Sequence, residues 1–448
     1  MAAVALAVFL AAYLGDAGLG FIVDDFAWIR HGQIHQPGDI VRVSTTAVGF
    51  YRPLVSLSFG IDYALFGIDP KPYGLTNLSL ALTCALLVFA LARALRLSRE
   101  GATVASVLWL FNFHGINMAV LWLSGRTSLL LTLFALGTAL SFLNNRPVLM
   151  ALSLALALLS KEEAVLLPLM LTLWFRVEPA ADAGATLSRR HALVAAWLVL
   201  GGYLAVRFGS GAFWPGNAPE YYRPVQSLGH LVRNVLEYAD RSATFSAAAV
   251  LLMLGWTRRW ISPDTDDRVR LRLAVIWVAC GFGLTVFLPV RSSLYAVLPS
   301  VGIVIAAATI AMRLTHATPA SQRLKMWACG LVIITALLPV YWSRNVRWTE
   351  LAALSSAAAG DLVRYARVMD EGGTVLIHDD QSTRVSLKHA WGTLVADMAA
   401  MYLGGRITVR VTPPAPGTPG VDARGLEPPP SHVLVLRDGR LVSQSGSD

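Results

Sequence analysis

Two adjacent carboxylates, Asp24 and Asp25, follow the first apolar segment in the stretch Phe21-Ile-Val-Asp-Asp-Phe26. If the apolar segments of this chain span a membrane, an ionisable pair at their boundary is costly to desolvate and is a candidate functional site. One interpretation is a general base that takes a proton from an acceptor hydroxyl, while its neighbour orients it or holds a divalent cation. The alternative is an ordinary acidic pair in water at a helix end.

Cationic side chains recur at the ends of other apolar segments. Lys161, followed by Glu162 and Glu163, lies between two short apolar segments, where lysine can meet a phosphate as a point charge while a carboxylate orients it. Arg126 stands at a segment end, where its guanidinium can bind phosphate bidentately, and Arg291 is another cation at the outer ends of two segments. Each has a plainer alternative, because turn residues are commonly solvated and boundary arginines commonly extend to the membrane interface.

Arg52, beside Tyr51 and before a proline, either anchors the loop that contains it or binds substrate. His31 and His35 have the i, i+4 spacing of metal ligands on a helix, but no third ligand is in register. His114 is a candidate buried polar group near the end of an apolar segment. The metal signal is therefore weak, and a divalent cation at the two aspartates remains one of several options.

The composition indicates what must position these residues. Of 448 residues, 55% are hydrophobic and only 15% are charged, against about 25% charged in soluble domains. The formal charge of +9 comes from arginines that gather between apolar segments, as the positive-inside rule expects, and does not indicate a nucleic-acid partner. All three cysteines lie singly in apolar segments, without metal-ligand spacing. The chain is therefore expected in a membrane.

Eleven apolar segments predict an all-α polytopic membrane bundle of about 11 transmembrane helices. A long first outer loop, about 16–72, follows the first of them. Because that first segment is short for a span, we expect the chain to begin before residue 1. The segments lie at about 1–15, 73–92, 101–123, 127–143, 147–159, 164–175, 191–208, 243–256, 273–289, 293–312 and 326–342.

The segments at 147–159 and 164–175 are either one helix with buried charges or a hairpin. If the two segments form a hairpin, the later cytoplasmic loops hold 11 Lys and Arg and the later outer loops hold 5, as the positive-inside rule expects. If they form one merged helix, the sides of all later loops are exchanged and the bias is inverted. We therefore predict a hairpin, with the amino terminus cytoplasmic and the carboxyl terminus outside. The first loop, the residues at 160–163, the loop with Tyr221 to Pro224, and Arg291 then reach the same outer face.

Beyond residue 343 the pattern changes to that of a small extracytoplasmic α/β module. Helix-like runs extend to about Met369 and from Leu387 to Leu403, and strand-like runs cover Thr374 to His378 and Arg406 to Val411. A Pro/Gly-rich linker precedes a last strand at His432 to Leu436, where Asp438-Gly439 offers a hairpin turn. Two domains are expected, a membrane domain at 1–343 and this module at 344–448.

The chain resembles the GT-C superfamily of glycosyltransferases, in particular the protein O-mannosyltransferases and their bacterial relatives. The resemblance extends over residues 1 to about 312, with its motifs in the order of the family, although the TPR repeats of the animal enzymes are missing. The matching motifs are Phe21 to Phe26, Tyr51-Arg-Pro-Leu54, Tyr73-Gly-Leu-Thr-Asn-Leu78, Ser124-Gly-Arg126, Ser160-Lys-Glu162 and Arg291 through Ser300.

The resemblance implies that Asp24 or Asp25 is the catalytic acidic residue and that Lys161, with Arg126 and Arg291, meets the phosphate of a polyprenyl-phosphate-linked sugar donor. Where the family often has an acidic residue after Gly-Arg, this chain has Thr127 and Ser128, which leaves a metal or acid role there unsupported. Expected is an inverting glycosyltransferase of the inner (plasma) membrane that acts on the outer face, with protein, lipid or glycan as acceptor. A flippase for a lipid-linked glycan and a non-catalytic scaffold are the alternatives.

Overall fold

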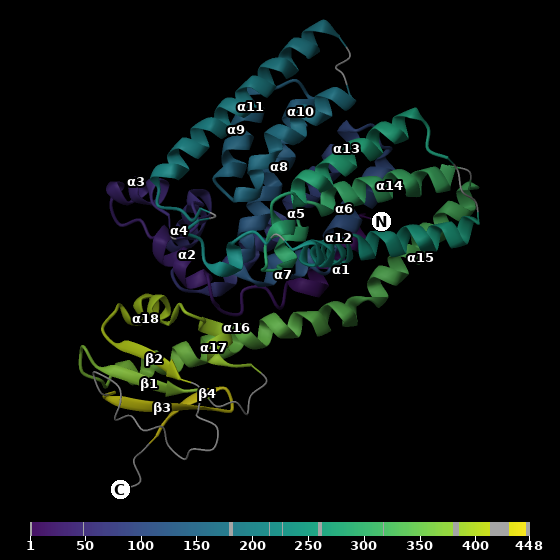
Figure 1. Ribbon diagram of the computed structural model, residues 1–448. Coiled ribbons are helices and arrows are strands. Elements are labelled where there is room, and N and C mark those ends of the chain that lie inside the picture. The colour runs from purple at the N-terminus through teal and green to yellow at the C-terminus, as the bar shows by residue number, and fades with distance from the viewer. Residues whose placement is uncertain are drawn as a thin grey trace.

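A helical bundle and a small α/β module form two parts of the computed structural model (Figure 1). The long helices of the bundle lie above in this view, and the four-stranded sheet of the module lies below. The amino terminus belongs to the bundle and the carboxyl terminus to the module. The structure describes residues 2–47, 49–178, 182–214, 216–225, 227–258, 262–316, 318–379, 385–412 and 430–444.

Most of the described chain is helical, and the helices overlap the apolar segments but differ from them in their bounds. Three of them, α2, α3 and α4, lie within the predicted first loop. The helices are α1 (Ala2–Tyr13), α2 (Asp25–Gly32), α3 (Pro37–Thr45), α4 (Pro53–Phe66), α5 (Pro70–Ala94), α6 (Arg99–Leu110), α7 (Gly115–Leu121), α8 (Arg126–Leu143), α9 (Pro147–Leu158), α10 (Leu167–Val177), α11 (Ala183–Gly209), α12 (Leu228–Thr257), α13 (Thr265–Phe282), α14 (Ser300–His316), α15 (Ala320–Ala336), α16 (Leu338–Ala366), α17 (Leu387–Trp391) and α18 (Val395–Leu403). Short 3₁₀ helices are η1 (Leu123–Gly125), η2 (Glu162–Leu166), η3 (Glu220–Tyr222), η4 (Thr285–Phe287) and η5 (Ser293–Ala296).

The lengths and composition of the described helices do not confirm eleven membrane spans. Within the described residues, four helices are long and apolar enough to cross a membrane, or five if the bent pair α6 and α7 forms one span. The four are α5, Leu123–Leu143, α11 and Ser321–Ala366. Helices α1, α4, α9 and α14 are apolar but short for the roughly 30 Å of a hydrocarbon core. The count of eleven spans therefore remains a prediction.

The segment expected as one helix at 101–123 is two helices, α6 and α7, at an angle of 63°. The break begins at Asn112, whose side-chain oxygen accepts hydrogen bonds from the backbone N–H groups of His114 and Gly115. A side chain that binds nearby backbone groups in this way competes with helical hydrogen bonding. This local competition explains the bend without a proline.

The segments at 147–159 and 164–175 form separate helices, α9 and α10. The turn at 160–163 joins their lower ends, and Arg189 of α11 ties together their upper ends. Its guanidinium bonds to the Asn145 side chain, before α9, and to the Glu178 carbonyl, after α10. The two helices therefore run in opposite directions, as predicted for a hairpin.

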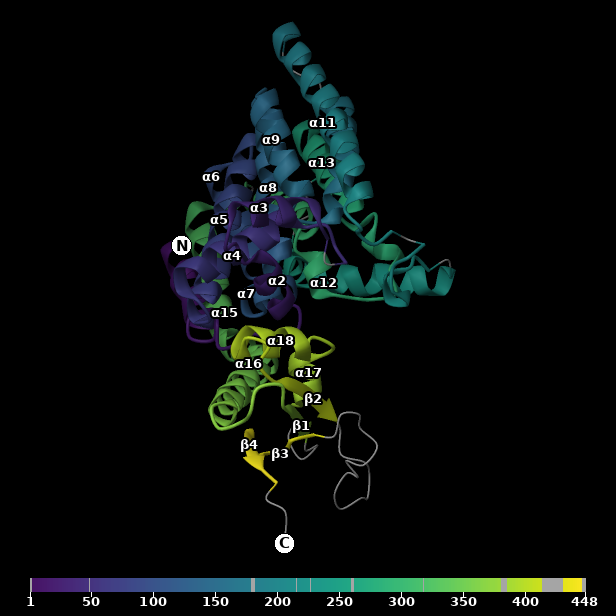
Figure 2. The same cartoon turned by 90° about the vertical axis from the view of Figure 1, so that its left-hand side faces the viewer.

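Helix α16 continues without a break across the expected domain boundary at residue 343 and leads into the module (Figures 1 and 2). The module's sheet has the order β2-β1-β3-β4, with β1 parallel to β2 and β3 and with β4 antiparallel to β3. Both residues of the turn between β3 and β4, Asp438 and Gly439, have positive φ, as a type I′ hairpin turn requires. The strands are β1 (Thr374–His378), β2 (Thr408–Thr412), β3 (His432–Arg437) and β4 (Arg440–Ser443).

The helix expected at 387–403 is divided into α17 and α18 at Gly392, which has φ 54°. The expected Pro/Gly-rich linker lies at 413–429, outside the described residues.

One hydrophobic core joins the module to the first loop. Phe26 and Ile29 of α2 belong to the same buried cluster as Ile377 of β1 and Trp391 of α17. An ion pair between Arg30 and Asp397, whose N–O distance is 2.6 Å, adds a polar contact between the same parts. The module thus packs directly on the loop that carries Asp24.

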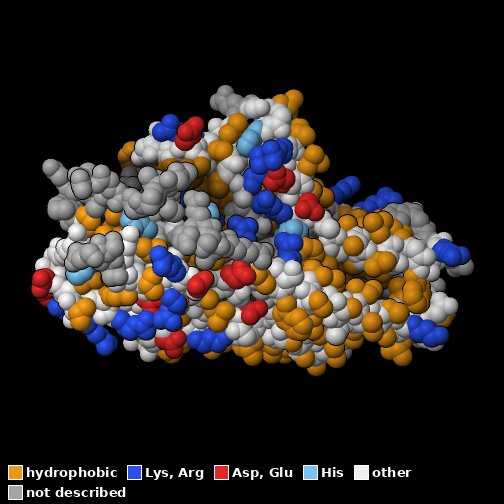
Figure 3. All heavy atoms as spheres, turned by 90° about the horizontal axis from the view of Figure 1, so that it is seen from below, with side chains coloured by type: hydrophobic (Ala, Val, Ile, Leu, Met, Phe, Trp, Pro, Cys, Tyr) orange, Lys and Arg blue, Asp and Glu red, His pale blue; other side chains and the backbone are white. Residues whose placement is uncertain are grey.

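Seen from the module side, charged side chains gather over one half of the molecule and hydrophobic ones over the other (Figure 3).

Candidate functional site

A cavity of about 540 Å³ opens where the first loop, the hairpin turn and α16 meet. Among the described residues that line it, Asp24 is the single carboxylate, whereas six side chains are lysine or arginine. The charged and aromatic residues of the wall are Asp24, Trp28, Arg52, His114, Trp122, Lys161, Tyr222, Arg241, Arg291, Tyr295, Arg344, Arg347 and Trp348. The cavity therefore suits an anionic ligand.

The two adjacent aspartates occupy different environments. Asp24 lines the cavity and immediately precedes α2, without a side-chain hydrogen bond to the first turn of that helix. Asp25 is fully buried, and its carboxylate accepts hydrogen bonds from the Ile22 and Ser124 backbone N–H groups and from the Ser124 hydroxyl. Asp24 is thus the carboxylate that a substrate can reach, and Asp25 fixes the turn beneath it.

Burial changes the acidity of both carboxyl groups. Desolvation raises the pKa of Asp24, against the opposing effect of the Arg52 charge. Desolvation also raises the pKa of Asp25 to about 7, even though its hydrogen bonds with Ser124 and Ile22 favour the ionised form. A carboxylate with a raised pKa holds a proton more readily, which is the property that a general base needs.

The Ser124-Gly125-Arg126 motif holds Asp25 in place. Gly125 packs so closely on α7 that an added Cβ would lie 2.5 Å from the Ala119 Cα. The Asn77 side-chain amide donates to the carbonyls of Ala119 and Leu123 and so fixes the same turn. Two motifs of the sequence thus meet around one carboxylate, although they are far apart along the chain.

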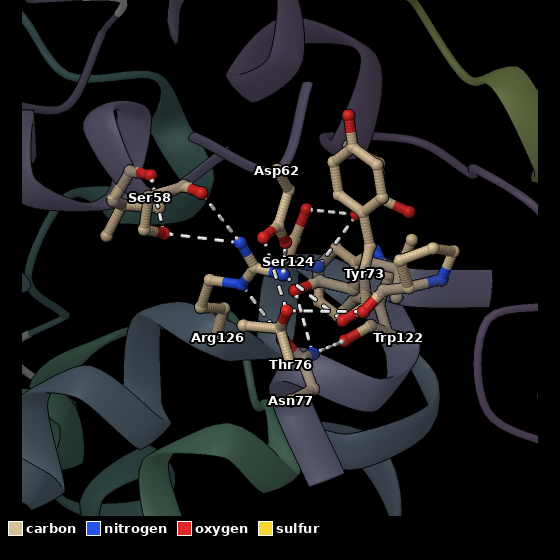
Figure 4. Close-up of polar contacts among 12 residues, drawn as sticks. Ser58, Asp62, Tyr73, Thr76, Asn77, Trp122, Ser124 and Arg126 are labelled. Carbon is tan, nitrogen blue, oxygen red and sulfur yellow. Dashed lines mark hydrogen bonds and ion pairs between the residues drawn. The ribbon is translucent and has the colours of Figure 1, made fainter. Parts of the chain in front are cut away.

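Arg126 lies outside the cavity and is fully buried (Figure 4). One guanidinium nitrogen pairs with Asp62 at 2.5 Å, and others donate to the Asn77 side chain at 2.9 Å and to the Ser58 carbonyl at 3.1 Å. The predicted role of Arg126 in binding the donor phosphate therefore gains no support from its position. Removing one partner of a buried ion pair of this kind leaves the other charge buried and unpaired, which destabilises the fold.

Lys161 belongs to the cavity wall and is 3% exposed. Its ammonium pairs with Glu163 at 2.8 Å and donates to the Ser128 hydroxyl at 2.9 Å. It also lies 4.8 Å from the centre of the Tyr295 ring. Lys161 is therefore a positioned cation, and Glu163 supports it from outside the cavity.

Arg52 connects the first loop to the hairpin turn. Its guanidinium donates from two nitrogens to Glu162, with the shorter distance 2.8 Å, and Arg207 of α11 lies 3.6 Å from the same carboxylate. Arg52 also lies over the Phe50 ring at 4.2 Å. Tyr51 points elsewhere, because its hydroxyl donates to the Ser44 carbonyl at 2.7 Å.

Arg291 lines the cavity from the segment between η4 and η5. Its Nε donates to the Asn234 side chain at 2.6 Å, and its terminal nitrogen pairs with Glu237 at 3.3 Å. The structure therefore brings Asp24, Lys161 and Arg291 to one cavity. The segments that the sequence placed on one face do meet there.

The C-terminal module holds the backbone just before the aspartates. Val23 has φ 46°, a conformation that is rare for a β-branched residue, and its N–H donates to the Ala390 carbonyl of α17 at 2.7 Å. The Trp391 indole donates to the Ser355 hydroxyl, which in turn donates to the Phe21 carbonyl. Helices α17 and α16 thus maintain a strained turn that sets the direction of Asp24.

Sequence reasoning missed several members of the wall and its supports. Asp62 was a carboxylate within an apolar helix, which was the available signal for a buried partner. Arg344 and Arg347 are three residues apart and so share a face of α16, but no motif marked them. No motif marked Arg241 or the tryptophans Trp122 and Trp348 either.

The donor atoms for a divalent cation are limited. Both oxygens of Asp25 already accept hydrogen bonds within the protein, so the adjacent aspartates do not present a joint pair of ligands. The part of the chain that the structure describes has no group of three His, Cys, Asp or Glu residues arranged for a metal. His31 contacts the Ser56 hydroxyl at 2.9 Å and lies outside the cavity wall. These residues do not fit a metal held by the protein alone.

No family model matches the sequence. Over 173 residues, the chain is 33% identical to the protein O-mannosyl-transferase Tmtc1 of Drosophila melanogaster. This match covers 34% of the chain but 20% of Tmtc1, so the chain spans about a fifth of the length of this relative.

Solved structures of ArnT from Cupriavidus metallidurans have the same fold. The apo form has a TM-score of 0.54 and 15% identity, with 91% of this chain and 85% of that chain covered. The form bound to undecaprenyl phosphate has a TM-score of 0.54 and 14% identity, with 98% and 97% covered. Together with the similarity to an O-mannosyl-transferase, this shared fold confirms that the chain resembles the GT-C superfamily of membrane glycosyltransferases.

Proposed function

We propose that this chain is a glycosyltransferase that moves a sugar from a polyprenyl-phosphate donor to an acceptor hydroxyl. The observation that carries the proposal is one cavity in which Asp24, the single carboxylate among the described lining residues, faces several cations. The relative whose structure contains undecaprenyl phosphate supports the class of donor. The positive-inside bias of the loops supports a cavity on the outer face, where a lipid-linked donor is available.

The reaction requires two groups with opposite charge. The Asp24 carboxylate takes the proton of the acceptor hydroxyl, whose oxygen then attacks the anomeric carbon of the donor sugar. The bond from that carbon to the phosphate oxygen breaks, and the lipid phosphate leaves with its electron pair. Lys161 and Arg291 stabilise the negative charge that develops on this leaving group. A single displacement of this kind inverts the configuration at the anomeric carbon.

Neighbouring residues support this reaction by positioning other side chains of the cavity. Asp25 and Ser124 orient the turn that carries Asp24. Glu163 positions the Lys161 ammonium, and Glu162 positions Arg52.

The direct test is turnover of radiolabelled polyprenyl-phosphate sugars by the purified protein. Asp24→Asn should lower turnover by about 10²–10⁴-fold while donor binding is retained, because general base catalysis contributes that much. Asp266→Asn is the matched control, since this aspartate is exposed at the start of α13 and lies outside the cavity wall. Unaltered turnover in Asp24→Asn would reject the proposed base. Transfer of the intact lipid across vesicles, without bond cleavage, would instead identify a flippase.

A further inference from the structure

The cavity has more cationic side chains than one donor phosphate requires. Six lysine and arginine side chains line it among the described residues, against one carboxylate. A sugar phosphodiester carries one negative charge, and the released lipid phosphate carries at most about two. The charge of the wall is therefore not balanced by the proposed donor.

Ion pairs within the protein divide these cations into two groups. Four of the six have a carboxylate partner at 2.8 to 3.3 Å, namely Arg52, Lys161, Arg241 and Arg291. Arg344 and Arg347 form no ion pair with any carboxylate of the described residues. The uncompensated charge thus lies on the α16 side of the cavity, away from the hairpin turn.

The contacts of Arg344 leave its charge intact. Its guanidinium donates to His114 Nδ1 at 3.0 Å and lies 4.9 Å from the centre of the Phe113 ring. Arginine has no acceptor atom, so His114 must accept at Nδ1 and is neutral, with its proton on Nε2. Asp240, 4.0 Å from that Nε2, precedes Arg241, which lines the same region. His114 therefore orients Arg344 without neutralising it.

The pair of stacked tryptophans beside Arg347 includes a polar atom without a partner. The Arg347 guanidinium is 5.4 Å from the Trp348 ring, and Trp348 stacks on Trp122 with ring centres 5.9 Å apart and planes at 5°. Both tryptophans line the cavity, and the buried indole nitrogen of Trp122 has no hydrogen-bond partner in the described structure. A buried donor of this kind is costly unless a ligand supplies an acceptor.

We propose that Arg344 and Arg347 form a second anion subsite, which binds a phosphoryl group other than the one at Lys161 and Arg291. This inference deepens the proposed function, on which it rests. A second phosphoryl group can come from an anionic acceptor or from a donor linked through a diphosphate. Both sources present the same oxygen acceptors to the two arginines of α16.

The test measures binding and needs no turnover. The full chain in non-ionic detergent is saturated with polyprenyl monophosphate and then titrated calorimetrically with inorganic phosphate. One further equivalent of phosphate should bind, and the double variant Arg344→Met/Arg347→Met should weaken this binding at least about tenfold, because charge-assisted hydrogen bonds are lost. Arg367→Met is the matched control, since this exposed arginine follows the same helix outside the cavity wall.

Two results would overturn the second subsite. The first is that inorganic phosphate does not bind once polyprenyl monophosphate is present. The second is that inorganic phosphate binds the double variant as tightly as it binds the wild type. Failure of the proposed function is separate, because it appears as no turnover by the wild-type protein or as unaltered turnover in Asp24→Asn, whatever the binding stoichiometry.

A second lipid distinguishes the two sources. If the donor is diphosphate-linked, polyprenyl diphosphate should bind at least about tenfold more tightly than the monophosphate, and the double variant should remove this difference. If the acceptor supplies the phosphoryl group, the two lipids should bind alike, and inorganic phosphate should bind in the presence of the monophosphate.

Discussion

Replacing Arg126 with methionine should destabilise the protein rather than weaken donor binding. The Arg126 guanidinium is fully buried, pairs with Asp62 at 2.5 Å and also donates to the side chain of Asn77 and the carbonyls of Ser58 and Tyr73. The substitution leaves the Asp62 carboxylate, itself 5% exposed, without its counter-charge. Loss of one partner of a buried ion pair costs about 3–5 kcal/mol.

This free energy predicts a measurable change in the melting temperature. A change of 1 kcal/mol shifts Tm by about 2–4 °C in chains of 150–250 residues, and by about half as much in a chain of this length. We therefore expect Tm of Arg126→Met to fall by about 3–10 °C. The double variant Arg126→Met/Asp62→Asn should recover about half of this loss, because it no longer buries an unpaired charge.

The assay is fluorescence-detected unfolding in detergent, together with the donor KM. Arg291→Met is the matched control: it lines the cavity, and its partner Glu237 keeps Arg233 and Arg241 as neighbours. That variant should raise the donor KM with little change in Tm. The reasoning is refuted if Arg126→Met keeps its Tm and raises the donor KM.

Three further predictions concern the turn that carries Asp24. An alanine Cβ at Gly60 would lie 2.1 Å from the Gly32 carbonyl oxygen, so Gly60→Ala should separate α4 from α2 and lower turnover by about 10²-fold. Gly38→Ala is the control, because a Cβ at Gly38 meets open space and should leave turnover unchanged. The folded protein holds the Asp25 proton up to about pH 7, whereas the unfolded chain releases it near pH 3.8, so this group makes the wild type less stable as pH rises through the interval. The Tm of the wild type minus the Tm of Asp25→Asn should therefore fall as pH rises. A constant difference would contradict this. Trp391→Phe removes the indole hydrogen bond to Ser355 of α16, which is worth about 1 kcal/mol. It should lower kcat about fivefold and leave the donor KM unchanged. A rise in the donor KM alone would contradict a positioning role for Trp391.

Local sequence patterns predicted the module well. The strand expected at Thr374 to His378 has those bounds in the structure, because a β-branched and apolar run there is enclosed by turn residues. The Asp438-Gly439 turn also follows from two residue types that tolerate positive φ. The division at Gly392 was missed, since a glycine within an apolar run does not reveal whether it ends a helix.

The sequence alone did not distinguish the charged residues that line the cavity from those that are buried outside it. Asp24 and Lys161 were recognised from residue type and position, and they line one cavity. Arg126 looked equally suitable from its sequence context. Its partner Asp62 is 64 residues away along the chain, and the Ser124 that holds Asp25 is 99 residues from it. No local pattern records such distant partners.

The sequence by itself determined that the chain is apolar and helical, that its cations gather at segment ends, and that an acidic pair follows the first segment. These properties depend on composition and on neighbours along the chain. Only the tertiary structure decided that Asp24 faces the cavity while Asp25 and Arg126 are buried, and that α16 contributes Arg344 and Arg347. The reason is physical: whether a charge is available to a ligand depends on which distant groups surround it, and the folded chain alone brings those groups together.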